Sequence, residues 1–542
     1  MRSLVLFGVA GSALAFSPGA LRPIPLRGVL RTVTRVASLD TSESTQELRV
    51  VIAGAGVGGL ALANALQKHP HVRTTVLEKT SAFKRFGGPI QLASNAMQTL
   101  KELDEETYKL IEAKATFTGN LTNGIKDGIR DEWYAMFDLK NPALERGMPY
   151  TCVVERPDLQ NILLDKLPEG VVRNAAGVQT YTQHEGGVTI ELEDGEKIDA
   201  DVLIGADGIW SAVRSTMHMN PTKGEGSGTS YSGYTVYAGE LDYDSKDNGE
   251  VGYKVYIGPQ QYFVITDIGN GRYQWYAFLA KPVGTAQSDL KPTEATADGC
   301  APGNPAYLRG VFEGWSGDIH HIIRATRDDE VEQRDLYDRP PAIRQPWTSG
   351  RVALLGDAIH AMMPNLGQGG CQAIEDAITL AEEISKIKTR DHSEVSAALS
   401  TYKDRRLVRS ASVQGLSRFA SDIIIRGFDT PAKIVDGEFQ NFNYAGIVTR
   451  ILQPILPVFF TIQFAFLYSG YRNEVGVKDV ANGAGLALFG SLLLLGFAAV
   501  AADAGLLLAF GFESASALFE ALSTGGFLDA AQTFGAEVSD IL

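Results

Sequence analysis

The sequence predicts an α/β fold in three parts: a Rossmann-type dinucleotide-binding domain, a second domain built on an antiparallel β-sheet, and a helical, apolar C-terminal tail. Three observations predict it. Near the N-terminus, a buried strand runs directly into a glycine-rich turn and a helix. Two later strands each end in a glycine and an aspartate, and a stretch of aromatic-rich strands lies between them. At 542 residues, the chain also exceeds what one hydrophobic core usually supports.

The N-terminal segment is typical of a targeting sequence. An apolar run, Leu4–Ala10, is followed by small residues as far as Ala15, as in a secretory signal peptide. Phe16–Ser38 contains four arginines, three prolines and no acid, which is typical of a transit peptide. The junction at Ala15 and Phe16 resembles the bipartite plastid presequences of algae with complex plastids. We therefore expect 1–46 to be a signal plus plastid transit presequence, with a single cleaved secretory signal as the alternative.

Composition excludes several classes of function. The chain has 64 acidic and 49 basic residues, a net charge of −15, and no basic run that would bind nucleic acid. Its cysteines, Cys152, Cys300 and Cys371, form no CxxC pair and have no histidine cluster nearby. We therefore expect no metal site and no disulfide framework.

The first glycine motif has the context that a dinucleotide site needs. The apolar run Leu48–Ala53 is predicted to be a buried parallel strand, and a helical pattern follows the glycines. Gly54 would permit the tight turn, and Gly56 would let the backbone approach a pyrophosphate. Gly59 would let helix and strand pack closely, with the helix N-terminus facing the phosphates.

A second predicted strand completes this unit. Val72–Leu77 ends at Glu78, at the distance where an acid binds the ribose hydroxyls of a dinucleotide. A glycine motif alone is weak evidence, but strand, glycines, helix, strand and acid in this order indicate a dinucleotide-binding domain.

Two further strands lead into acids at their carboxyl ends, where α/β proteins bind ligands. The run 201–205 precedes Asp207 and Gly208, and the run 351–356 precedes Asp357. With the glycine motif, these segments resemble the group A flavoprotein monooxygenases, which favours FAD over NAD. In that arrangement Asp357 can hydrogen-bond the ribityl chain of the flavin.

A glycine-rich turn, Gly367–Gly370, precedes the last predicted helix of this domain. Its apolar residues have helical spacing: Ala373, Ile374, Ala377, Leu380, Ala381 and Ile384. The N-terminus of a helix carries roughly +0.5 charge. It would point at the N1/C2 edge of the flavin and suit the anionic reduced form.

The resemblance also implies a set of site residues. Pro364 and Gly367 would wall the pocket where flavin and oxygen react, and no side-chain nucleophile is expected. The residues expected to bind FAD are Gly54, Gly56, Gly59, Glu78, Arg156, Asp207, Gly208, Asp357, Gly367, Gly369 and Gly370.

The exact residues of several segments indicate which family of flavoprotein monooxygenases the chain resembles. Tyr231–Ala280 is predicted to form antiparallel strands rich in aromatic residues, which is neutral evidence by itself. The segments 87–96, 274–278, 334–341 and 360–371 are less generic. Together they closely resemble the zeaxanthin epoxidase family, and the likeness extends from about Leu48 to Arg409.

That resemblance implies epoxidation of a β-ring double bond in a xanthophyll: zeaxanthin, antheraxanthin or a related algal carotenoid. Reduced FAD would take up O2 at C4a and pass the distal oxygen atom to the alkene. The reductant would be an external donor, NAD(P)H or reduced ferredoxin. Alternatives are an aromatic-ring hydroxylase on the same scaffold, a flavin-dependent non-redox isomerase or cyclase, and a non-catalytic carotenoid- or FAD-binding protein.

The C-terminal region is strongly apolar. Ile451–Leu467 has no charge, and Ala484–Ala502 is nearly as long as the roughly 20 residues that span a bilayer. We expect association with thylakoid or other plastid membrane lipid, with a buried helical hairpin as the alternative.

These observations divide the chain into six segments. We expect a presequence, a discontinuous FAD-binding domain, a β-sheet substrate domain between its two parts, a C-terminal helical region and an apolar membrane-associating tail. Their predicted bounds are 1–46, 47–225 and 331–400, 226–330, 401–475 and 476–542.

Overall fold

A computed structural model describes the greater part of the chain. The described residues are 47–82, 88–244, 247, 249–258, 260–284, 301–343, 345–426, 433–435, 438–440 and 456–469. The chain divides into two compact units, Met1–Ser44 and Thr45–Leu542, and everything below concerns the second. The predicted presequence 1–46 and the tail segment 476–542 lie outside the described residues.

A six-stranded sheet forms the centre of the dinucleotide-binding part, in the order β19-β20-β12-β1-β2-β8. All its neighbouring strands are parallel except β19 and β20. The predicted strands at 48–53 and 72–77 are confirmed. The bounds are β1 Leu48–Ala53, β2 Val72–Leu77, β8 Val172–Arg173, β12 Val202–Gly205, β19 Thr348–Ser349 and β20 Val352–Leu354.

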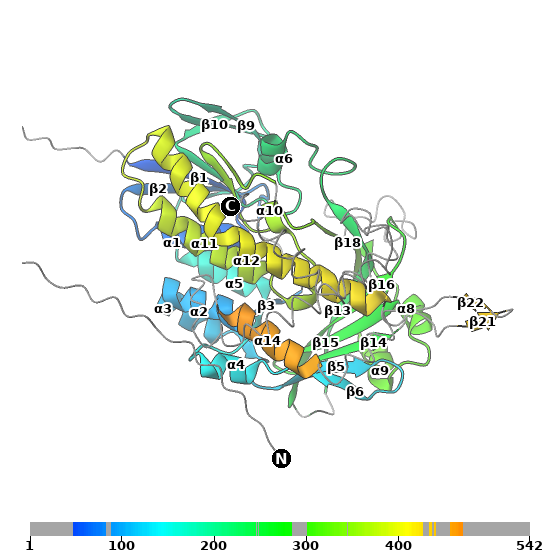
Figure 1. Cartoon of the computed structure of the whole chain (residues 1–542). Helices are drawn as coiled ribbons and strands as arrows, with labels where there is room; N and C mark the ends of the chain where they lie inside the picture. Colours follow the sequence, from blue (N-terminus) through cyan, green and yellow to red (C-terminus); the bar gives the residue numbers. More distant parts are fainter. Residues whose placement is uncertain are drawn as a thin grey trace, which may run out of the picture. The chain divides into compact units, whose positions relative to one another are not determined.

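Helices cover one side of this sheet, and a small sheet lies on the other (Figure 1). The helices pack in series: α1 contacts α5 and α11, and α11 contacts α12. The helix bounds are α1 Val57–Leu66, α5 Arg156–Asp165, α11 Gly369–Ile384 and α12 His392–Arg426. The strands of the small sheet are β9 Val178–His184, β10 Gly187–Leu192 and β11 Lys197–Ala200.

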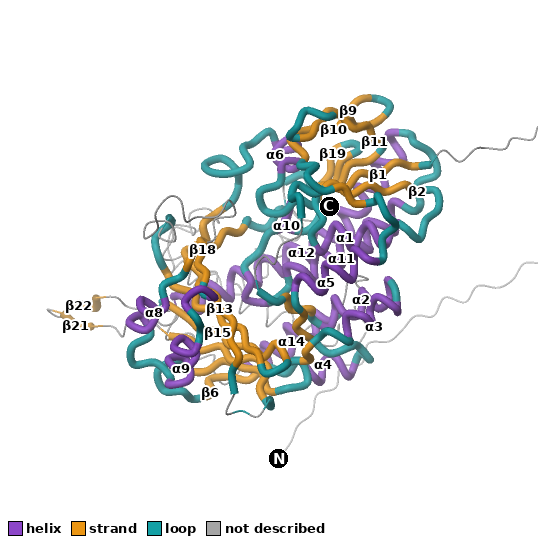
Figure 2. The backbone as a smooth tube through the Cα atoms, turned by 180° about the vertical axis from the view of Figure 1, so that it is seen from behind, coloured by secondary structure: helices purple, strands orange, loops and turns teal. Residues whose placement is uncertain are grey.

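The second large sheet has eight strands, in the order β17-β18-β13-β16-β15-β14-β5-β6. Of these strands, Figure 2 labels β6, β13, β15 and β18. The predicted aromatic strands are present, but β14 and β5 pair in parallel, so the sheet is mixed rather than wholly antiparallel. Two strands, β5 and β6, precede the predicted substrate segment in sequence. The bounds are β5 Thr122–Asp127, β6 Trp133–Met136, β13 Ser230–Asp242, β14 Val251–Gly258, β15 Gln261–Gly269, β16 Arg272–Ala280, β17 Ala301–Pro302 and β18 Glu332–Asp338.

The two faces of this sheet have different neighbours, because successive side chains of a strand point to opposite faces. Phe263 and Trp275 lie on the face that packs against α8 (Pro305–Val311) and α9 (Gly317–Ala325). Tyr262 and Phe278 lie on the other face, and their rings stack at 4.2 Å. That second face turns toward the cavity described below.

Shorter elements connect these layers. A three-stranded sheet consists of β3 Ile90–Leu92, β4 Thr116–Phe117 and β7 Cys152–Val154. The remaining helices are α2 Ser94–Leu103, α3 Glu105–Glu112, α4 Lys140–Glu145, α6 Ala212–His218, α10 Asp357–His360, and the 3₁₀ turns η1 Asp328–Glu330 and η2 Pro364–Leu366.

The C-terminal region differs from its prediction in two ways. It is not helical throughout, because β21 (Lys433–Val435) and β22 (Glu438–Gln440) pair between its helices. Its last described helix, α14 (Leu456–Tyr468), packs against α2, α4 and β6. Much of the apolar run at 451–467 therefore contacts protein. None of the helices in the described ranges is long and apolar enough to cross a bilayer, and Ala484–Ala502 falls outside those ranges.

Candidate active site

A cavity of about 720 Å³ extends from the carboxyl edge of the six-stranded sheet to one face of the eight-stranded sheet. Its volume is in the usual range for a ligand site. Backbone of the glycine-rich loops and the start of α11 form one end. Apolar side chains form the other end, among them Val236, Val255, Ile257, Val264, Phe278 and Leu336.

The loop between β1 and α1 depends on its glycines. Gly54 has φ +105°, and a Cβ there would lie 2.4 Å from the carbonyl oxygen of Ala206. A Cβ on Gly59 would lie 2.1 Å from the carbonyl oxygen of Gly54, so only glycine allows this approach of helix and strand. Gly56 lines the cavity, and a Cβ there would meet no other atom within 4 Å. The space beside Gly56 is free for a ligand.

Glu78, at the end of β2, braces this loop. One carboxylate oxygen accepts a hydrogen bond from the Ala55 amide at 2.9 Å. The other accepts from the amide and the hydroxyl of Thr80, each at 2.9 Å. The structure thus gives Glu78 a role in holding the loop, and its contact with a ribose remains a prediction.

Asp207 follows β12 and caps α6. Its Oδ2 accepts hydrogen bonds from the amides of Ala212 at 2.8 Å and Val213 at 3.2 Å. Burial raises the pKa of this carboxyl. Its Oδ1 is buried and bonds to nothing in the described part of the chain. Gly208 beside it has φ +79° and lines the cavity.

Charged groups meet where the two sheets face each other. Arg156, the first residue of α5, lines the cavity with Asp357 and with Arg334 of β18. Burial lowers the pKa of Arg156, and the like charge of Arg334 adds to this effect. Asp357 opens onto the cavity, and the surrounding protein raises the pKa of its carboxyl. Arg156 and His360 oppose that rise.

The start of α11 borders the same space. Pro364, Gly367, Gly369 and Gly370 all line the cavity. Gly367 has φ +60°, and a Cβ there would lie 2.7 Å from the side chain of Gln91. A Cβ on Gly369 would lie 4.0 Å from Asp357 Oδ1, so the helix N-terminus and the carboxylate are close together.

These features fit a flavin dinucleotide. The backbone at Gly56 and Gly208 leaves open space, as close approach of a phosphate or ribose requires. Arg156 Nε and Asp207 Oδ1 are buried polar atoms that have no bonding partner among the described residues. A buried donor or acceptor left unpaired is costly, so both atoms suit a bound polar ligand.

The structure brings eight predicted site residues to the cavity wall and leaves four behind it. The lining residues are Gly56, Arg156, Gly208, Asp357, Pro364, Gly367, Gly369 and Gly370. The supporting residues are Gly54, Gly59, Glu78 and Asp207.

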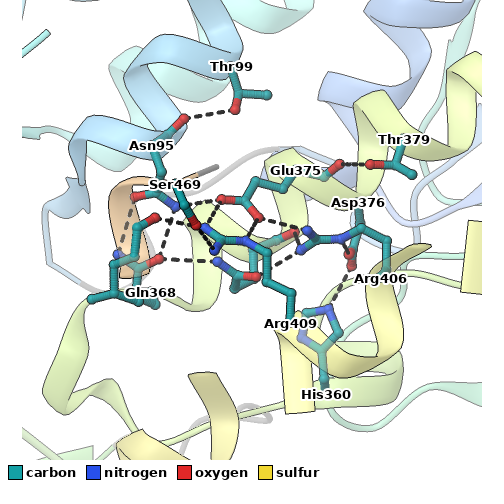
Figure 3. A network of polar contacts seen from close by, with 12 residues as sticks. Asn95, Thr99, His360, Gln368, Glu375, Asp376, Thr379, Arg406, Arg409 and Ser469 are labelled. Carbon is teal, nitrogen blue, oxygen red and sulfur yellow. Dashed lines mark hydrogen bonds and ion pairs between the residues drawn. The ribbon is translucent and has the colours of Figure 1, made fainter. Parts of the chain in front are cut away.

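Sequence reasoning missed a buried charge network between α11 and α12 (Figure 3). Arg406 donates to Asp376 Oδ1 and to Glu375 Oε2, both at 2.7 Å. His360 Nε2 lies 2.6 Å from Asp376 Oδ2. Burial opposes ionisation of Glu375, but Arg409 and Arg406 outweigh it and lower the pKa of the carboxyl to about 2. The network therefore remains charged inside the protein.

The network continues to both ends of the cavity. Asn95 donates to Glu375 Oε1 at 2.7 Å and to Gln368 Oε1 at 3.1 Å, next to the start of α11. Arg409 donates to the carbonyl oxygens of Phe466 at 3.1 Å and Leu467 at 2.7 Å, at the end of α14. A cation there also complements the helix dipole.

Sequence reasoning also missed that α14 forms part of the cavity wall. Phe460, Gln463 and Phe464 line the cavity from this helix. Their spacing, at i, i+3 and i+4, places them on one face of a helix, and this spacing is the sequence feature that could have identified them. The run lies within the C-terminal helical region predicted at 401–475, for which the sequence predicts no site residue.

Comparison with known proteins is consistent with this geometry. Residues 47–300 and 318–416 match the family model described as FAD binding domain. The chloroplastic zeaxanthin epoxidase of Nicotiana plumbaginifolia is 36% identical over 422 residues, which cover 76% of this chain and 58% of that protein. That of Oryza sativa subsp. japonica is 38% identical over 385 residues, which cover 70% of this chain and 55% of that protein. The chain thus spans less than three fifths of these relatives.

Solved structures show the same fold. Klebsiella pneumoniae HpxO complexed with FAD and uric acid is 25% identical, with a TM-score of 0.63 over 78% of this chain and 97% of that one. A salicylate hydroxylase substrate complex is 22% identical, with a TM-score of 0.61 over 78% and 98% of the two chains. The chain therefore belongs to the FAD binding domain family, and its fold is that of the group A FAD-dependent monooxygenases.

Proposed function

We propose that this protein epoxidises the β-ring double bond of a xanthophyll, using FAD and O2. The observation that carries the proposal is the cavity itself, which has a polar, glycine-lined end and an aromatic, apolar end. The first end suits a flavin, and the second suits a hydrocarbon ring. The relatives named above, which are zeaxanthin epoxidases, support this choice of substrate.

The lining residues support chemistry that resides in the cofactor. The charged residues among the described lining residues are one carboxylate, Asp357, and two guanidinium groups, Arg156 and Arg334. The described lining contains no serine, cysteine, histidine or lysine. When bound and reduced, the flavin would activate O2 for transfer of one oxygen atom to the alkene. The protein then has to orient the substrate and exclude water.

Each end of the cavity has its own task in this proposal. Asp357 would accept a hydrogen bond from the ribityl chain, and the N-terminus of α11 would stabilise negative charge on the flavin. Pro364 would border the position where oxygen reacts. The stacked rings of Tyr262 and Phe278 would pack against the β-ring and keep water out.

Location and partners belong to the same proposal. The presequence pattern and the chloroplastic relatives support a plastid location. The substrate dissolves in lipid, which gives the protein a reason to contact thylakoid or plastid membranes. The electron donor would be NAD(P)H or reduced ferredoxin.

The test is a reconstituted assay. The purified protein is loaded with FAD and given a reductant, O2 and a panel of xanthophylls, and products are separated by chromatography. We expect a product heavier by one oxygen atom, labelled when ¹⁸O2 is used, and none under nitrogen. Oxygen-independent turnover of a carotenoid would instead establish an isomerase or cyclase.

One observation favours a second candidate, an aromatic-ring hydroxylase. Two cations, Arg156 and Arg334, line the cavity, and the described lining contains one anion, Asp357, so positive charge is in excess. Two cations could bind an acidic aromatic compound. Salicylate and related phenolic acids are therefore included in the same assay. Hydroxylation of these acids without epoxidation of any carotenoid would overturn the proposal.

A further inference from the structure

The amide of Gln463 opens onto the cavity from α14. The residue is only 4% exposed, and it lines the cavity between Phe460 and Phe464. No hydrogen bond joins its side chain to another residue in the described part of the chain. The amide oxygen and N–H groups, which face the cavity, can therefore pair with a polar group of a ligand that fills this space.

The surroundings of Gln463 are apolar. Phe460 and Phe464 flank it on the same helix face, and the ring of Phe137 lies 5.6 Å from Phe460 and 5.8 Å from Phe464. Ligand pockets of this kind use a small number of polar groups to fix the orientation of a ligand. On the α14 wall, the amide of Gln463 is suited to that role.

The helix that carries Gln463 is held firmly at its C-terminal end. Arg409 donates to the carbonyl oxygens of Phe466 and Leu467. The Tyr468 hydroxyl lies 3.0 Å from the Thr151 hydroxyl, and both groups are buried. The amide is therefore presented by a fixed element. This element lies beyond residue 416, where the match to the FAD binding domain family ends.

We infer that Gln463 binds the ring hydroxyl of the substrate and so selects hydroxylated over unhydroxylated carotenoid rings. The inference rests on the proposed function. A primary amide offers an acceptor oxygen and two N–H donors, and a hydroxyl both donates and accepts, so the two groups match in either direction. A hydrocarbon ring in the same position leaves the amide unpaired, and such a mismatch is the strongest basis for discrimination.

The experiment compares zeaxanthin, whose rings carry hydroxyl groups, with β-carotene, whose rings do not. Gln463→Met keeps the length of the side chain and removes the amide. We expect its kcat/KM for zeaxanthin to fall about 10- to 100-fold, because the ring hydroxyl is then buried without a partner. The value for β-carotene should stay the same or rise. Because each variant is measured with both substrates, a general folding defect cancels in the ratio.

The matched control is Gln179→Met, on the exposed surface of β9, which should keep the wild-type ratio. A wild-type ratio in Gln463→Met would overturn the inference while leaving the proposed function intact. If the wild-type protein epoxidises neither compound, the proposed function fails, and binding decides the inference. Quenching of tryptophan fluorescence in the FAD-loaded protein should then show tighter binding of zeaxanthin than of β-carotene, with the difference lost in Gln463→Met. Equal binding by the wild type would overturn the inference.

Discussion

Arg409 and Glu375 form a buried two-point ion pair between α12 and α11. Nε of Arg409 donates to Oε2 at 2.7 Å, and Nη2 donates to Oε1 at 2.8 Å. The same guanidinium binds the carbonyl oxygens of Phe466 and Leu467 at the end of α14. The pair therefore connects α11, whose N-terminus borders the cavity, to α14, which lines the cavity with Phe460 and Phe464.

Breaking this pair should destabilise the protein and loosen α14. Arg409→Met leaves the Glu375 carboxylate with one less cation inside the protein, which typically costs about 3–5 kcal/mol. We expect a lower midpoint of denaturation and faster hydrogen exchange in 456–469. Arg405→Met is the control on the same helix, because Arg405 is partly exposed, and its partner Glu383 keeps a second cation, Lys386. Such a pair contributes about 0–1 kcal/mol. Equal losses in the two variants would contradict the assignment.

The network should also determine how the protein responds to acid. The ordinary pKa values of Glu375 and Asp376 are 4.5 and 3.8, and both fall to about 2 in the folded protein. A lowered carboxyl pKa stabilises the fold above the unfolded-state value, and this contribution disappears as pH falls toward the folded-state value. We therefore expect the free energy of unfolding to decrease between about pH 4.5 and pH 2. Glu375→Gln should be less stable at pH 7 and show a shallower decrease, measured by urea denaturation across that range.

Substitution of Gly56, in the first loop, and of Gly59, in the first turn of α1, should have different effects on folding and FAD binding. Gly56→Val places a side chain in open cavity space, so we expect a folded protein without bound FAD. Gly59→Ala drives a Cβ to within 2.1 Å of a backbone oxygen, so we expect loss of folded protein. Circular dichroism and flavin absorbance after gel filtration separate the two results. Stoichiometric FAD in Gly56→Val would show that the loop does not bind the cofactor.

Asp357 should affect cofactor retention more than folding. Asp357→Ala would remove the proposed hydrogen bond to the ribityl chain, worth about 0.5–1.5 kcal/mol, so the Kd for FAD should rise about 2- to 10-fold. Asp404→Ala, at an exposed position of α12, is the control. We expect the same thermal stability in both apoproteins. Wild-type affinity for FAD in Asp357→Ala would count against a role in the cofactor site.

The parts of the site that could be predicted are those whose residues lie close together in the sequence and form a recognisable pattern. The strand before Gly54, the turn and the following helix occupy adjacent positions, and each has a recognisable pattern. The aromatic strands were predicted to be antiparallel, and they pair in this way with one another, whereas the parallel pairing of β14 with β5 was not predicted. That exception could not be predicted, because β5 lies over a hundred residues earlier in the chain.

The buried polar network had no such signal. Glu375 and Asp376 lie on the polar side of the predicted apolar stripe, where charged residues normally face water. The structure buries them because Arg406 and Arg409, about thirty positions later, supply compensating charge. The position of α14 could not be predicted for a similar reason. An apolar run is equally compatible with a bilayer and with a protein core, and contacts with distant residues such as Arg409 decide between them.

Two truncations of the C-terminal region, one after α14 and one before it, should have different effects on activity. Removing 470–542 leaves α14 in place, whereas removing 456–542 also deletes Phe460, Gln463 and Phe464 from the cavity wall. We expect the shorter deletion to bind FAD and to epoxidise detergent-dispersed xanthophyll at close to the full-length rate. The longer deletion should lose most of this activity, because the substrate end of the cavity is then open to water.

Vesicles test the remaining part of the hypothesis. If Ala484–Ala502 associates with lipid, the full-length protein should sediment with thylakoid-like vesicles, and the protein lacking 470–542 should stay in the supernatant with its flavin. The truncated protein should then epoxidise xanthophyll in vesicles poorly while it still uses detergent-dispersed substrate. A buried hairpin gives the opposite pattern, since removing it would expose apolar core and cause precipitation. Full-length protein that does not sediment with vesicles, together with a precipitating truncation, would exclude the membrane-associating tail.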